Sequence, residues 1–147
     1  MLAEYYGVWL TLHLLCAMTF GGAVIFEVLI LESLHARFPA DTMQAIEAGI
    51  VTRARKIMPW VVGTLFITGL IMLHVHFPGH EGMTTTRFGR LLLVKIGLAT
   101  AVLGLFVTAL TLFWRGRMRP ALFRGLHLAV FVLVLGIVVL AKGMFYW

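Results

Sequence analysis

The side chains that could carry chemistry lie within or beside long apolar runs. His13, Cys16 and Glu27 belong to an apolar stretch from Tyr5 to Leu31. At about 100° per residue, Cys16 and Glu27 fall within about one-sixth of a turn of His13, so the three side chains share one helical face. Polar groups are costly in lipid, and this face is therefore expected to meet protein neighbours or a cofactor.

Further candidate residues lie near the ends of the other apolar runs. They are His74, His76 and His80 at the end of the second run, Lys95 in the third, and His127 and Lys142 near the two ends of the fourth. Neutral imidazole binds copper, zinc and haem iron, whereas a protonated lysine binds an anionic group such as a haem propionate.

These residues predict two different sites. The copper site would use His13, His74, His76, Cys16 and Met18. The haem site would use His13 as an axial ligand, with Lys95 and Lys142 holding the propionates. The residues alone do not choose between copper and haem.

Several of these residues also have a plain structural interpretation. His76 and His80 are typical of a membrane boundary, and Lys142 can extend its ammonium group to the interface. Glu27 is expected either to form an ion pair on the cytoplasmic side or to belong to a proton path. His127, which precedes the fourth run's apolar centre, is expected to be structural or to contact a phospholipid headgroup.

The composition defines a membrane protein. The chain has 147 residues, of which 61% are hydrophobic and 12% charged, and its mean hydropathy is +1.00. A soluble domain of this size does not need so much apolar surface, so we expect one integral membrane domain over residues 1–147. The single cysteine excludes an intramolecular disulfide. The net charge of +6 does not indicate nucleic-acid binding, because the basic residues cluster in short links beside apolar runs.

Four spans are predicted, at about residues 6–31, 57–77, 88–114 and 125–146, since about 20 apolar residues cross a bilayer. The expected fold is therefore all-α, a four-helix transmembrane bundle in contact with the lipid bilayer. Asp41 and Gln44 predict a capped, short interfacial helix before the second span, whose first turn would contain Pro59. Gly63 and Gly69 predict close helix contact. A small-residue stripe from Gly97 to Thr111 predicts a packing seam, which is also a route to a homo-oligomer.

The basic residues also predict the orientation. The links between spans one and two and between spans three and four hold eight Lys and Arg residues, against Arg87 and Arg90 on the opposite side. Positive charge is retained in the cytoplasm, so both termini are expected outside the cytoplasm.

Two families resemble parts of the chain. Residues 85–95 (TTRFGRLLLVK), together with His13, the pair Gly21-Gly22 and Phe26, resemble the bacterial copper-resistance D (CopD-like) membrane domain. This resemblance implies copper homeostasis at a bacterial inner membrane, by uptake across the membrane or by binding at its outer face. The side on which both termini are expected would then be the periplasm, and a periplasmic copper carrier is an expected partner. The superfamily is also similar to the HemJ-type protoporphyrinogen oxidases, which bind haem b; His13 and Lys95 match their functional His and Lys. Gly143 follows Lys142 where those oxidases tend to have Lys-Pro.

The sequence thus favours an inner-membrane copper-homeostasis protein. The alternatives are a haem-b oxidoreductase or cytochrome, and a bundle subunit without a cofactor. No nucleophile–base arrangement or phosphate-binding loop indicates a particular enzyme class.

Overall fold

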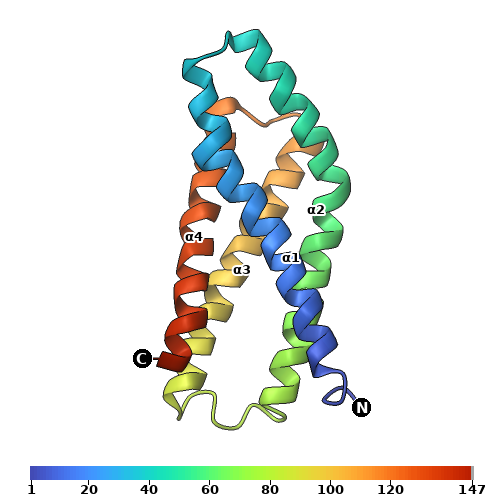
Figure 1. Cartoon of the computed structure of the whole chain (residues 1–147), viewed down its shortest axis with the longest axis vertical. Coiled ribbons are helices and arrows are strands. Elements are labelled where there is room, and N and C mark those ends of the chain that lie inside the picture. Colours follow the sequence, from blue (N-terminus) through green and yellow to red (C-terminus); the bar gives the residue numbers. More distant parts are fainter. Residues whose placement is uncertain (147) are drawn as a thin grey trace. The chain divides into compact units, whose positions relative to one another are not determined.

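The computed structural model, which describes residues 1–146, is all-helical (Figure 1). Its elements are α1 (Tyr6–Phe26), the π-helical turn η1 (Glu27–Leu31), the 3₁₀ turn η2 (Glu32–Ala36), α2 (Ala40–His76), α3 (Arg87–Trp114) and α4 (Pro120–Tyr146). Four helical segments are long and apolar enough to cross a membrane, which confirms the all-α class and a multi-pass membrane protein. The chain divides into two compact units: unit 1 contains Ala3–Leu70, and unit 2 contains the residues from Ile71 onward.

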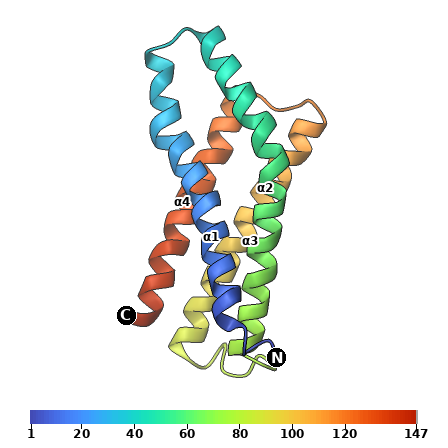
Figure 2. The ribbon, with the colours of Figure 1, turned by 45° about the vertical axis from the view of Figure 1, so that its right-hand side comes forward.

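Unit 1 is a helical hairpin in which α1 and its extension run antiparallel to α2 (Figure 2). Phe20, Val24 and Leu31 are buried on the first arm. On the second arm Met43 is only 1% exposed. The Nε2 atom of His35 lies 2.8 Å from the Oε1 atom of Glu47, so a polar contact joins the two arms near the link between them.

The first arm extends past the predicted end of span one. After α1 the backbone widens into η1, where the Glu32 N–H donates to the carbonyl oxygen of Glu27, five residues earlier. The chain then tightens into η2, so helical structure reaches Ala36. π-helical turns are rare, and those that do occur often lie at functional positions. In this chain the turn begins at Glu27.

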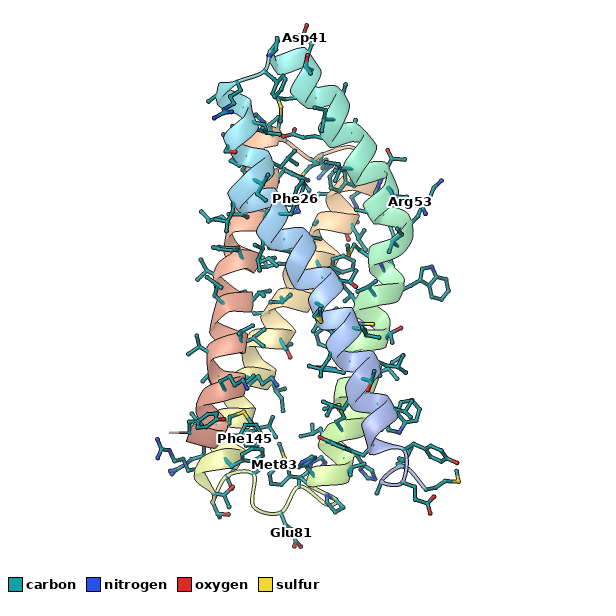
Figure 3. The ribbon with its side chains drawn as sticks, viewed as in Figure 1. Phe26, Asp41, Arg53, Glu81, Met83 and Phe145 are labelled. Carbon is teal, nitrogen blue, oxygen red and sulfur yellow. The ribbon has the colours of Figure 1, made fainter. Side chains whose placement is uncertain are left out.

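The prediction of a separate interfacial helix before span two is wrong. α2 is one helix of 37 residues, and Pro59 lies in its interior rather than in a first turn. No glycine or proline occurs between Ile50 and Met58, and Arg and Lys are good helix formers, so nothing local ends the helix there. At 1.5 Å per residue α2 is about 55 Å long, so one end extends beyond a hydrocarbon core of roughly 30 Å. Asp41, at its start, is labelled in Figure 3.

Unit 2 is built on the antiparallel packing of α3 and α4. Val102 on α3 and Val130 on α4 are buried, as is Gly143. A Cβ atom at Gly136 would lie 3.4 Å from the Cδ1 atom of Leu98, which shows how closely the two helices approach. α4 begins at Pro120, five residues before the predicted span, because proline is well suited to a first helical turn.

The small-residue stripe does not serve as a seam between α3 and α4. Gly97, Ala101, Gly104 and Thr108 are all exposed. A Cβ atom at Gly97 or Gly104 would meet nothing within 4 Å. Within unit 2 the stripe therefore lies on the face of α3 that α4 does not cover.

Candidate functional site

His13 is held by hydrogen bonds to α2 within unit 1. Its Nδ1 atom lies 3.0 Å from the carbonyl oxygen of Leu65 and 3.1 Å from the Oγ1 atom of Thr68. A carbonyl oxygen can only accept, so the Nδ1 atom carries the proton and donates it. In the neutral imidazole this tautomer places the lone pair on Nε2, the nitrogen that would bind a metal or accept a proton.

Thr68 completes the support of the imidazole ring. Its side chain is 2% exposed, and its hydroxyl donates to the carbonyl oxygen of Thr64 at 2.7 Å. The hydroxyl oxygen can then accept from the Nδ1 atom of His13, so the buried polar groups satisfy one another. The ring is thus fixed in both tautomer and orientation.

Gly69 lets α2 approach the His13 ring. A Cβ atom at this position would lie 3.2 Å from Cε1 and 3.6 Å from Nδ1 of His13. The predicted close contact at Gly69 is confirmed. At Gly63 a Cβ atom would meet nothing within 4 Å, so the same prediction is wrong there.

Replacing Gly69 by alanine should displace the His13 ring by a few tenths of an ångström and lengthen its hydrogen bond to Leu65. We expect a loss of about 1–2 kcal/mol in the free energy of unfolding, which is the usual range for overpacking. Thermal unfolding of the detergent-solubilised protein measures this. Gly63→Ala in the same helix is the matched control and should be neutral or stabilising; equal losses in both variants would contradict the contact.

The other predicted metal ligands are not gathered around His13 within unit 1. Cys16 is half-buried on α1, but Met18 is 71% exposed. His74 and His76 belong to unit 2 and are exposed, with the Nδ1 atom of His76 donating to the carbonyl oxygen of Met72 at 3.2 Å. Among their described residues, neither unit contains a group of three or more His, Cys, Asp or Glu side chains that could hold a metal ion.

The predicted propionate partners differ in their surroundings. Lys95 is half-buried on α3, whereas Lys142 is exposed on α4. Glu27 is half-buried at the start of η1. The exposure of Lys142 agrees with an ammonium group that extends to the interface.

His127 has a structural explanation. Its Nδ1 atom donates to the carbonyl oxygen of Phe123 at 2.9 Å, and the two rings lie 4.2 Å apart between centroids. Phe123 in turn contacts Phe113 edge to face. Through Phe123, the His127 ring helps to hold the beginning of α4 against the end of α3.

The first half of the motif in residues 85–95 builds the start of α3. The Oγ1 atom of Thr86 accepts the N–H of Gly89 at 3.0 Å and donates to the carbonyl oxygen of Gly82 at 2.7 Å. A Cβ atom at Gly89 would lie 2.5 Å from the carbonyl oxygen of Met83, so only glycine fits. Thr86 and Gly89 therefore fix the turn that leads into α3.

Phe88 adds an aromatic contact at the same end of unit 2. Its ring lies 6.2 Å from that of Phe77 and 5.6 Å from that of Phe145, between centroids. Figure 3 labels Phe145 and the buried Met83 at this end of the unit. The Thr-x-Phe-Gly part of the motif is thus explained by folding, without a ligand.

Reasoning from the sequence missed the polar partners of the histidines. Thr68 and the Leu65 carbonyl support His13, and Glu47 pairs with His35. The spacing of Thr64 and Thr68, one helical turn apart beside Gly69, is a signal that could have indicated Thr68. A backbone carbonyl carries no side-chain signal at all.

No family model, curated protein or solved structure matches the chain. The resemblance to the copper-resistance D domain therefore stays a prediction, and only the short motifs support it.

Proposed function

We propose that the protein is a haem-b-binding membrane protein of the cytochrome or oxidoreductase class, in which His13 would bind the iron. The observation that carries this proposal is the hydrogen bond from the Nδ1 atom of His13 to the Leu65 carbonyl oxygen. A histidine that binds a metal nearly always donates its other ring N–H to a carbonyl, carboxylate or water, which fixes the ring and raises its basicity.

The donor set of unit 1 suits haem better than a copper ion held by side chains alone. A porphyrin supplies four nitrogen ligands, so the protein has to supply only one or two. Unit 1 offers one imidazole, that of His13, whose Nδ1 atom donates to a carbonyl oxygen and whose Nε2 atom therefore carries the lone pair. A copper site of protein ligands would need further nitrogen or sulfur donors around the same ion.

The residues of the chain have separate roles in this proposal. His13 would bind the haem iron, while the Leu65 carbonyl and the Thr68 hydroxyl orient the imidazole and keep its proton on Nδ1. Haem, when bound, supplies one-electron redox chemistry of its iron. Lys95 and Lys142 remain the predicted partners of the propionates.

Copper homeostasis is the second candidate, and one observation favours it. Three imidazoles, those of His74, His76 and His80, are exposed within seven residues at the end of α2 and in the following turn. Exposed imidazoles are accessible to a periplasmic copper carrier, which would be the partner in this case. His13 would then take part with Cys16 or Met18.

The haem and copper contents of the purified protein distinguish the two candidates. The full chain is expressed with ample haem and copper, purified in detergent, and assayed for both per chain. We expect haem in a fixed ratio to protein and copper well below it. Copper in a fixed ratio without haem would support copper homeostasis. The absence of both haem and copper would support a subunit without a cofactor.

We further propose that both termini lie on the periplasmic side of a bacterial inner membrane, as the basic links indicate. In a Cys16→Ser background, a membrane-impermeant maleimide should label Thr85→Cys in intact cells. Thr42→Cys, which lies in the opposite link region, should react only after the cells are permeabilised. The reverse pattern would overturn this orientation. Both threonines are exposed, so accessibility within the protein is matched.

A further inference from the structure

The charge of the protein is divided very unevenly between the two units. Unit 1 holds five acidic residues and four Lys and Arg residues, so its charges nearly cancel. Unit 2 holds one acidic residue, Glu81, and eight Lys and Arg residues. Half of those eight lie between Arg115 and Arg124, in the link from α3 to α4 and the first turns of α4.

The link between α3 and α4 is a defined turn. Gly116 has φ +65, a left-handed conformation that glycine adopts without strain. The Gly116 N–H donates to the Phe113 carbonyl oxygen at 3.1 Å, and the Arg117 N–H donates to that of Leu112 at 2.9 Å. This pair of bonds is the Schellman arrangement, which ends a helix in a fixed geometry. The arginines therefore project from an ordered turn.

Three arginines of this turn carry uncompensated charge. Arg115, Arg117 and Arg119 are exposed, and none of them forms an ion pair with any residue that the structure describes. Glu81 cannot neutralise them within unit 2, because it precedes α3 and the turn follows the other end of that helix. A fixed group of guanidinium ions without carboxylates attracts anions with several oxygen atoms.

Apolar side chains flank the arginines. Trp114 is 77% exposed and Leu122 is 40% exposed, on the two helices that the turn connects. An exposed tryptophan beside arginine is typical of the boundary between hydrocarbon and headgroups. An inorganic anion would use only the guanidinium groups, whereas a lipid would use the apolar side chains as well.

We propose that the turn Arg115–Arg119, with Trp114 and Leu122, is a binding site for an anionic phospholipid. The guanidinium groups bind the headgroup phosphate, and the two apolar side chains contact the beginning of the acyl chains. This goes beyond membrane orientation, which requires only that positive charge lies on one side. It is also independent of haem or copper binding at His13.

Titration of lipid into the delipidated full chain in neutral-detergent micelles tests the proposal, with native mass spectrometry as the readout. Phosphatidylglycerol should bind, and phosphatidylcholine with the same acyl chains should bind at least tenfold more weakly. Each Arg beside an anionic lipid surface contributes about 1 kcal/mol, so Arg117→Gln with Arg119→Gln should weaken phosphatidylglycerol binding about 30-fold. Arg117→Lys with Arg119→Lys keeps the charge and should show a smaller loss, which guards against a folding defect.

The matched control is Arg87→Gln with Arg90→Gln, which removes two exposed arginines from the other end of α3. This variant should bind phosphatidylglycerol within about threefold of the unchanged protein, because the screened field of distant charges is weak. An equal loss in the control, or equal binding of phosphatidylcholine, would overturn the site. Displacement of the lipid by inorganic phosphate at similar concentration would indicate a simple anion site. Displacement by a polynucleotide would indicate a nucleic-acid surface. Either result would overturn the proposal.

Discussion

Replacing His13 by alanine is expected to remove haem from the protein almost completely, by more than about 100-fold in affinity, because the imidazole that would bind the iron is lost. Loss of a supporting hydrogen bond to a metal-binding histidine typically lowers affinity 10–100-fold. Loss of the ligand itself should have a larger effect. Thr68→Val keeps the ligand and the Leu65 carbonyl but removes a hydroxyl 3.1 Å from Nδ1, so we expect a loss of about tenfold. Haem content per chain and haem titration measure both effects.

The controls for this prediction use the exposed imidazoles and the ligand itself. His76→Ala should leave haem content unchanged, since the His76 side chain is exposed and its Nδ1 atom donates within its own helix, to Met72. Added imidazole should restore part of the haem binding of the His13→Ala variant, which a general folding defect would not allow. If copper is the physiological ligand, the pattern is different: His76→Ala weakens metal binding and Lys95→Met has little effect.

Replacing Gly89 by alanine is expected to destabilise unit 2 by about 3 kcal/mol, the upper end of the usual range for overpacking. The added methyl group would lie 2.5 Å from the Met83 carbonyl oxygen, 2.6 Å from that of Gly82 and 2.6 Å from the Met83 Cα atom. All three are backbone atoms, so no side-chain rotation relieves the overlap. The turn that Thr86 closes has to open, and the buried Met83 side chain is displaced with it.

Thermal unfolding in detergent measures this effect, and the same helix offers a matched control. A Cβ atom at Gly97 meets nothing within 4 Å, and alanine is a better helix former than glycine by up to about 1 kcal/mol. Gly97→Ala should therefore be neutral or stabilising. A Gly89→Ala variant as stable as the Gly97→Ala variant would contradict the close packing of the turn.

The fold could be predicted well from the sequence where the determining signals are local. A bilayer requires about 20 apolar residues per helix, so the four apolar runs give four helices. The third span was predicted at residues 88–114 and α3 is Arg87–Trp114, because a threonine cap begins it and Gly116 ends it. α2 was predicted too short because hydropathy changes near Lys56 although the helical backbone does not end there.

The site could be predicted only in part, because the hydrogen bonds that hold His13 join residues far apart in the sequence. His13 was predicted as a functional residue because it shares one helical face of an apolar run with Cys16 and Glu27. Its partners lie 52 and 55 residues later in the chain, and one of them is a backbone carbonyl. Which face of α2 meets α1 is decided by packing around Gly69, and a single sequence contains no direct signal for it.

The visible absorption spectrum of the detergent-purified protein, first oxidised and then reduced with dithionite, tests the central claim most directly. Protein expressed with ample haem should show a Soret band and, on reduction, sharpened bands of a b-type haem. The His13→Ala variant, purified in parallel, should show neither. A flat spectrum of the unchanged protein, or an unchanged haem spectrum in the His13→Ala variant, would contradict the proposal that His13 binds the haem iron.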